Sequence, residues 1–152
     1  MGAARLEIVP LQPEAAAAAA LLLAGYVSDD TPGAVDIERC REAVAHHLGA
    51  GGDPFLLAHR EGVWAGFVHL GWGRSTSTGR PVLRVQGLYT APAHCRRGVA
   101  GALPAHASEL ASLRAAARLQ LGVDGGNVAA RRLYERCGFE LLSDKQVYMK
   151  FL

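Results

Sequence analysis

The residues most able to do chemistry lie in one stretch, where an expected strand runs through a basic turn into an expected helix. At the start of a helix the first N–H groups have no partner within the helix, and the helix dipole is positive, so a phosphate binds there readily. A glycine in the turn lets the backbone approach the ligand closely, and two arginines add charge where a diphosphate would lie. The stretch is therefore a candidate anion site. Its members are Leu88, Tyr89, Thr90, Cys95, Arg96, Arg97, Gly98, Val99, Ala100 and Gly101.

Two other phosphate-binding loops are excluded. The sequence contains no G-x-x-x-x-G-K-[ST], and no G-x-G-x-x-G that follows a first strand. Nucleoside-triphosphate binding and a Rossmann dinucleotide site are therefore disfavoured. Taken alone, the basic stretch can also be a solvated turn before a helix.

A second segment adds to this pattern. Tyr134 follows Asn127 by seven residues, on an expected helix that stops at Gly138 and Phe139. Together the two segments resemble the GNAT superfamily of acetyl-CoA-dependent N-acetyltransferases. The first resembles that family's [QR]-x-x-G-x-[GA] pyrophosphate loop, at Cys95, Gly98 and Ala100. The second resembles its N-x-x-A-x-x-x-Y-x-x-x-G-F signature, at Asn127, Ala130, Tyr134, Gly138 and Phe139.

The resemblance implies a binding mode for acetyl-CoA. The backbone of Leu88 and Thr90 would pair with the pantetheine arm, in a V-shaped gap beside a second parallel strand, Leu119 to Val123. The N–H groups from Arg96 to Gly101 would hold the pyrophosphate. Asn127 would form a hydrogen bond further along the cofactor.

The resemblance also implies a reaction, the direct attack of a primary amine on the thioester. Tyr134 would give a proton to the leaving thiolate, and a backbone N–H near Leu88 would stabilise the oxyanion. His69 titrates in the range that suits a general base for the ammonium. The alternatives are a core aromatic for Tyr134 and a structural histidine for His69.

The acceptor is expected to be the amine of a small molecule or a peptide. Asp29 and Asp30, in the expected loop between the first two helices, could attract a cationic amine, although a solvated acidic turn fits them as well. Trp72 could line the acceptor side. Cys95 departs from the family pattern, Pro104 is expected to kink or weaken the helix after the turn, and Gly101 adds flexibility there. These departures motivate an alternative function, a GNAT-fold module that binds acyl-CoA or a partner with little or no turnover.

The elements that position these residues follow from hydrophobic spacing and from turn residues. We expect one α/β domain over residues 1–152, of mixed α+β type, with a mixed sheet of about six to seven strands and helices on both faces. The expected order is βααβββαβαββ. The strands are Leu6–Val9, Phe55–His59, Val63–Leu70, Val82–Thr90, Leu119–Val123, Phe139–Leu142 and Val147–Leu152.

The expected helices have recognisable ends. The first runs from Ala15 to Ala24, opened by Pro13 and closed by Gly25. The second follows the N-cap Asp36 as far as Leu48 and buries Ile37, Cys40, Val44 and Leu48. A third follows Gly98 with Leu103, Ala107, Leu110 and Leu113 on one face, and the last is Val128–Cys137.

Composition narrows the function further. The formal net charge is +2, too small to indicate nucleic-acid binding. The 3 cysteines lack the spacing of a zinc site, so no metal is expected, and they suit a reducing, cytoplasmic setting. The apolar alanine-rich stretch is too short to cross a membrane, so no membrane partner is expected. A homodimer could form through Val147–Leu152.

Overall fold

The computed structural model describes residues 5–95 and 98–152. The chain forms two compact units, Met1–Gly122 and Val123–Leu152. In the described part of the chain no helix is both long and apolar enough to span a membrane.

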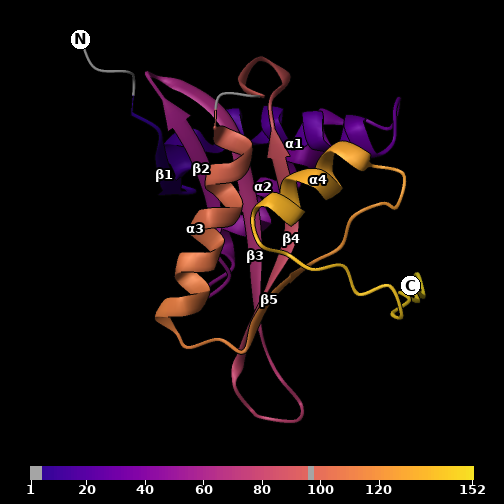
Figure 1. The fold of residues 1–152 in the computed structure, drawn as a ribbon. Coiled ribbons are helices and arrows are strands. Elements are labelled where there is room, and N and C mark those ends of the chain that lie inside the picture. The colour runs from indigo at the N-terminus through magenta and orange to yellow at the C-terminus, as the bar shows by residue number, and fades with distance from the viewer. Residues whose placement is uncertain (1–4, 96–97) are drawn as a thin grey trace. The chain divides into compact units, whose positions relative to one another are not determined.

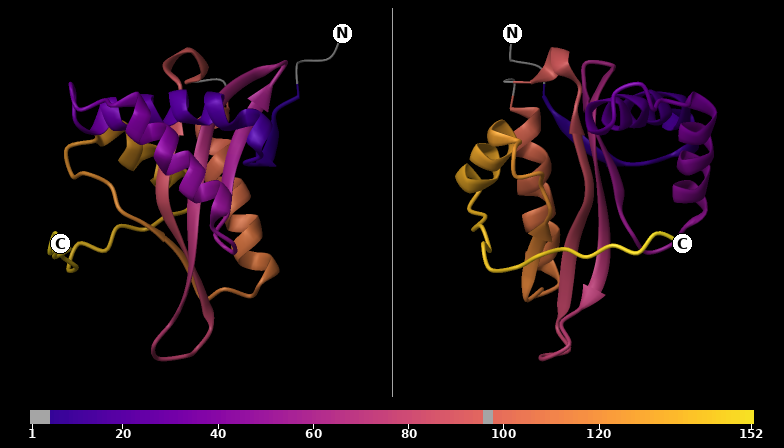
Figure 2. Two further views of the ribbon diagram at one scale, coloured as in Figure 1. Left: turned by 180° about the vertical axis from the view of Figure 1, so that it is seen from behind. Right: turned by 90° about the vertical axis from the view of Figure 1, so that its right-hand side faces the viewer.

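The first unit contains a five-stranded mixed sheet with the strand order β1-β2-β3-β4-β5. The strands β1 to β4 pair antiparallel, whereas β5 is parallel to β4. The α-helices α1 and α2 pack on one face of this sheet and α3 on the other (Figures 1 and 2). The elements are β1 (Glu7–Pro10), η1 (Pro13–Ala15), α1 (Ala16–Asp30), α2 (Ile37–Gly49), β2 (Phe55–Arg60), β3 (Val63–Arg74), β4 (Pro81–Thr90), η2 (Pro92–His94), α3 (Val99–Leu113) and β5 (Arg118–Leu121).

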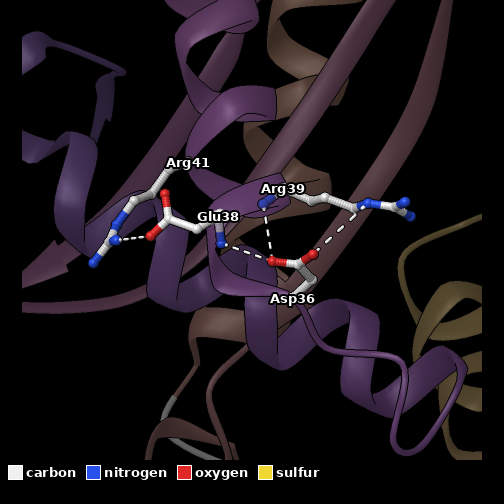
Figure 3. Close-up of polar contacts among 4 residues, drawn as sticks. All are labelled: Asp36, Glu38, Arg39 and Arg41. Carbon is white, nitrogen blue, oxygen red and sulfur yellow. Dashed lines mark hydrogen bonds and ion pairs between the residues drawn. The ribbon is translucent and has the colours of Figure 1, made fainter.

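The N-terminus of α2 confirms the predicted cap. The Asp36 carboxylate accepts hydrogen bonds from the N–H groups of Glu38 at 3.0 Å and Arg39 at 3.4 Å (Figure 3). Glu38 in turn pairs with Arg41 one turn further along. Of the apolar positions expected inside, Leu48 is exposed, and the neighbouring His47 is the half-buried residue at this end of α2.

The predicted end of the first helix, at Gly25, is wrong. The helix α1 passes through Gly25 and ends at Asp30, so Gly25 does not close it. A Cβ at Gly25 would lie 2.3 Å from the Tyr89 hydroxyl oxygen, which means that the glycine makes room for a ring on β4. A glycine within a helix costs only about 1 kcal/mol relative to alanine, and packing readily offsets this.

The helix α3 buries Leu103 and Ala107 as predicted, with Leu110 packed half-buried on the same core, but the predicted Leu113 lies outside it. Val99, Leu103, Ala107 and Ala111 are buried at i, i+4 spacing, whereas Leu113 is 81% exposed. Pro104 lies inside α3 and is also buried. The helix continues through Pro104, although this residue supplies no N–H to the helical hydrogen bonds.

The second unit contains α4 (Val128–Arg136), and the two strands predicted after it are absent. Residues 139–142 and 147–152 form no ladder, and a turn bond from Lys145 N–H to the Leu142 carbonyl oxygen is found between them. An alternating apolar pattern marks a face that could be buried, but a strand exists only where a partner edge accepts its backbone. The sheet therefore has five strands and not six to seven.

Candidate active site

The candidate site begins where β4 and β5 stop pairing. Their parallel register runs from Val82 opposite Arg118 to Val85 opposite Leu121, and ends there. The strand β4 continues to Thr90, and over this length it is paired with β3. The strand β5 ends at Leu121 and not at Val123 as predicted, so no strand of the first unit pairs with residues 86–90 on this side.

The end of β4 is held by close packing on β3. Gly66 pairs with Thr90, and a Cβ at Gly66 would lie 2.4 Å from the Tyr89 carbonyl oxygen. Leu88 packs with the core on the α3 side, whereas Tyr89 packs with the core on the α1 side. Burial raises the pKa of the Tyr89 hydroxyl, and the Asp29 carboxylate raises it further. These contacts fix the backbone of the proposed pantetheine strand.

In the turn after β4, both the N–H and the thiol of Cys95 are close to backbone oxygens. Its N–H donates to the Pro92 carbonyl oxygen at 3.3 Å, so this group is engaged within η2. Its thiol lies 3.9 Å from the Thr90 carbonyl oxygen. Arg96 and Arg97 lie outside the described residues.

Gly98 begins α3 in a left-handed conformation. It is the N-cap of α3, with φ of 83°, a left-handed value that favours glycine. The Ala102 N–H donates to the Gly98 carbonyl oxygen at 3.0 Å, and the N–H groups of Val99, Ala100 and Gly101 precede this first α-helical bond. Val99 itself is fully buried, so the first turn is anchored in the core.

His69 lies on the α2 side of the sheet, in a small aromatic cluster. Its ring centroid is 4.4 Å from that of His47 on α2 and 5.4 Å from that of Phe55, its cross-strand partner. Burial lowers the pKa of His69, the neighbouring His47 lowers it further, and Asp53 opposes both. Burial also lowers the pKa of His47. Both imidazoles are therefore held toward the neutral form, which can accept a proton.

The two predicted acceptor carboxylates lie in the last turn of α1 and not in a loop. Asp30 accepts a hydrogen bond from the Thr31 hydroxyl at 3.3 Å, and both aspartates are exposed. In the described part of the chain neither forms an ion pair. Each aspartate raises the pKa of a tyrosine through its charge, Asp29 that of Tyr89 and Asp30 that of Tyr26.

Trp72 does not join His69 on the same face. It packs against the core on the α3 side, with the Arg114 guanidinium 4.5 Å from the ring centroid. Its backbone N–H donates to Asp53 at 3.0 Å. The predicted acceptor residues are thus divided, with Trp72 on one face of the sheet and His69 on the other.

In the second unit, Asn127 and Tyr134 both have structural partners. The Asn127 side-chain oxygen caps α4 by accepting from the Ala130 N–H at 3.1 Å. This bond leaves the side-chain NH₂ group of Asn127 as the donor for any further contact. The Tyr134 ring lies edge-on to Phe139 at 5.9 Å.

Comparison with known families shows which protein family this chain belongs to. Residues 21–139 match the model of the Acetyltransferase (GNAT) family. The chain belongs to the GNAT acetyltransferase family.

Solved GNAT structures have the same fold as this chain. A probable acetyltransferase has a TM-score of 0.84 at 23% identity, with 96% of this chain and 97% of that one covered. The ribosomal-protein-alanine N-acetyltransferase from Brucella melitensis biovar Abortus 2308 has a TM-score of 0.79 at 24% identity, with 97% and 99% covered. The aminoglycoside N-acetyltransferase AAC(6')-Iy, in complex with CoA, has a TM-score of 0.77 at 18% identity, with 98% and 97% covered. No curated protein matches the sequence.

Two residues of this GNAT chain were missed in the sequence. His94 lies in η2, directly before the turn, and its Nδ1 atom is buried without a hydrogen-bond partner among the described residues. His47 contacts His69 from a different element. The helical spacing in the sequence places His47 beside the apolar face of its helix. It does not indicate that His47 contacts His69, which lies on a strand.

Proposed function

We propose that the protein transfers the acetyl group of acetyl-CoA to a primary amine of a small molecule or a peptide. The observation that carries this proposal is the end of β4. The strand runs past its last pair with β5, at Val85 and Leu121, and leads through η2 toward the left-handed Gly98 that starts α3. A strand edge that lacks a β5 partner, followed a few residues later by a helix N-terminus, suits an amide-containing arm that ends in a diphosphate.

The residues present fit this cosubstrate. A Cβ at Gly98 would meet nothing within 4 Å, so the glycine leaves open space at the turn. Leu88, Tyr89 and Thr90 would bind the arm through their backbone, and Gly98 to Gly101 would bind the diphosphate with Arg96 and Arg97. Asn127 would donate through its side-chain NH₂ group. The Cys95 N–H already donates to the Pro92 carbonyl oxygen, so Cys95 would contact the cosubstrate only through its side chain.

Acetyl-CoA supplies an activated acetyl thioester. His69 takes a proton from the ammonium of the acceptor, so that the free amine can attack. The new C–N bond forms as the C–S bond breaks, and the N–H near Leu88 stabilises the negative charge on the carbonyl oxygen. Tyr134 gives its phenolic proton to the leaving thiolate. The attacking nitrogen loses its second proton to solvent, and the tyrosinate left after proton donation takes a proton back from solvent.

Asp29 and Asp30 would attract the cationic acceptor. They stand in the last turn of α1, where the helix dipole is negative and no basic side chain offsets it. Through Tyr89, this end of α1 borders the end of β4. A cationic amine is thereby drawn toward the strand that would bind the thioester arm.

The test is release of coenzyme A with a panel of amines. Wild-type protein is expected to release thiol only when an acceptor is present, and Tyr134→Phe to reduce that release. Tyr148→Phe is a matched control, because Tyr148 is 90% exposed and also lies in the second unit. Binding of acetyl-CoA without acceptor-dependent release from any amine would favour the non-catalytic module instead.

The cytoplasmic setting and the homodimer stay predictions. The strand expected at Val147–Leu152 is absent, but the apolar side chains of this segment are exposed. Sedimentation of the full chain, with and without residues 147–152, tests the dimer.

A further inference from the structure

A hollow of about 180 Å³ lies on the sheet, away from the turn that starts α3. Its lining residues on β3 and β4 lie toward the loop that connects these strands. Figure 2 shows both strands continuing past the end of α2 to this loop. Asp53, in the loop before β2, borders the hollow. Its lining is Asp53, Gly71, Trp72, Gly73, Arg74, Val82, Arg84, Gln86 and Arg118, which we call the arginine hollow.

The strand register assigns the arginine hollow to the α2 face. Gly71 pairs with Arg84, and Val82 pairs with both Gly73 and Arg118. Paired residues project to the same face, and so do alternate residues of one strand. The residues between them, such as Leu83, pack on the α3 side. Arg84 and Arg118 therefore project to the same face as His69.

Two of the residues that line the hollow are glycines, which place no side chain in it. A Cβ at Gly73 would meet nothing within 4 Å, and a Cβ at Gly71 would lie 2.8 Å from the Gln86 amide nitrogen. The Gln86 side chain thus lies over Gly71. Glycine weakens a strand, and within one it often marks a place where a ligand or another chain approaches closely.

The arginine hollow carries an excess of positive charge. Its lining has three guanidinium groups and one carboxylate, and that carboxylate accepts the Trp72 N–H. Arg74 donates to the Gly79 carbonyl oxygen, and Arg118 donates through Nε to Gln120. In the described part of the chain none of the three arginines forms an ion pair with a carboxylate. A carboxylate or phosphate would relieve their mutual repulsion and accept two hydrogen bonds from one guanidinium.

We propose that the arginine hollow binds the acidic group, a carboxylate or a phosphate, of the acceptor amine. This inference rests on the proposed function, because it names the acceptor of that reaction as an amine that also bears an acid. Arg84 and Leu88 lie four residues apart on β4, a span of roughly 13 Å at 3.3 Å per residue. An arginine side chain shortens the span that the acceptor must bridge. Gln86 lies between the two positions and would contact the middle of such an acceptor.

The first arm of the test uses inorganic phosphate as the probe and does not depend on acetyl transfer. Melting temperature is measured against chloride at equal ionic strength. Phosphate is expected to stabilise the wild type more than Arg84→Gln/Arg118→Gln, in which only the proposed diphosphate turn at Gly98 remains to bind it. The matched control is Arg39→Gln/Arg41→Gln, which removes the same charge from two exposed arginines of α2. An equal response of the wild type and the hollow variant would overturn the proposal.

The second arm compares three acceptors that share one chain: aminohexanoate, aminohexyl phosphate and the neutral aminohexanamide. The wild type is expected to favour one acidic acceptor in kcat/KM by about tenfold to a hundredfold, and the hollow variant to lose the preference. The favoured acid distinguishes carboxylate from phosphate. Equal rates with the neutral amide would overturn the assignment to the acceptor. If no amine releases thiol from the wild type, the proposed function fails, and the phosphate arm alone decides whether the hollow binds an oxyanion.

Discussion

Tyr134 and Phe139 are joined twice at the end of α4. The Phe139 N–H donates to the Tyr134 carbonyl oxygen at 3.0 Å, and their rings meet edge-on at 5.9 Å. Gly138, with φ of 91°, donates to the Glu135 carbonyl oxygen at 3.1 Å between them. This is the Schellman arrangement, in which an apolar contact accompanies two backbone bonds. The Gly-Phe pair of the motif therefore fixes the residue proposed as the acid.

This geometry separates a loss of chemistry from a loss of structure at Tyr134. Tyr134→Phe keeps the ring that contacts Phe139 and removes the hydroxyl group. We expect kcat to fall by about 10²- to 10⁴-fold, the usual contribution of a general acid. The melting temperature is expected to change little. Phe139→Ala should do the reverse and lower stability, so a Tyr134→Phe enzyme of wild-type kcat would contradict the role of this residue.

Two roles of the Asn127 side chain can be tested separately, the cap of α4 and the proposed hydrogen bond to acetyl-CoA. Asn127→Ala removes the cap of α4 and is expected to cost about 1 kcal/mol. Asn127→Asp keeps an accepting oxygen and loses the NH₂ donor. We therefore expect Asn127→Asp to raise the KM for acetyl-CoA at nearly unchanged stability. If both variants keep the wild-type KM, Asn127 is a cap and nothing more.

The close approach of β3 and β4 at Gly66 predicts that a side chain at this position lowers the stability of the protein. Gly66→Ala would place a methyl group 2.4 Å from a backbone oxygen of β4, which cannot swing away as a side chain can. Overpacking of this kind costs about 1–3 kcal/mol. Gly73→Ala on the same strand is the control, since it meets no atom within 4 Å. Urea unfolding of both variants measures the difference, and equal stabilities would contradict the packing described.

The two neighbouring histidines make stability depend on pH. Each has a lower pKa in the folded protein than in the unfolded chain, so the unfolded chain binds more protons just below pH 6.5. Stability is therefore complete above that pH and falls as the pH drops toward the folded-state values. Unfolding measured at pH 7.5 and pH 5 should show a smaller loss for His47→Gln/His69→Gln than for the wild type. His59→Gln is the control, and an equal loss in all three proteins would exclude the effect.

The same pair sets the acid limit of activity, if His69 is the base. His47 lowers the pKa of His69, so His47→Gln should move the acid limb of kcat/KM to higher pH. A limb that stays in place while the pKa of His69 moves, as seen by NMR titration, would remove His69 from the reaction.

Features with local causes could be predicted from the sequence. Asp36 caps α2 as expected. The strands expected at Phe55–His59 and Val63–Leu70 form and pair, and the turn between them has positive φ at Glu61 and Gly62, as a tight hairpin turn requires. Gly138 also adopts the left-handed conformation that suits the predicted helix stop. In each case the residue and its immediate neighbours decide the conformation.

Features that depend on distant partners could not be predicted. Gly25 is predicted to end a helix, but it lies inside α1 because the Tyr89 ring packs against it. Leu113 is predicted to be buried, but Ala111 is the buried residue near this end of α3. The strands expected after Phe139 lack a partner edge. The contact of His47 with His69, and the arginine hollow, both join elements that no local spacing relates.

The central claim is that acetyl-CoA binds where β4 leads into α3. The most direct test is the melting temperature of the wild type and of Gly98→Val, each with and without acetyl-CoA. Valine cannot readily adopt φ of 83°, and its branches would fill the space beside the turn. At a hundred times its dissociation constant, acetyl-CoA should add about 2.7 kcal/mol to the stability of the wild type. A clear rise in the wild type that Gly98→Val abolishes is the predicted result, and no rise in the wild type at millimolar acetyl-CoA would contradict the account.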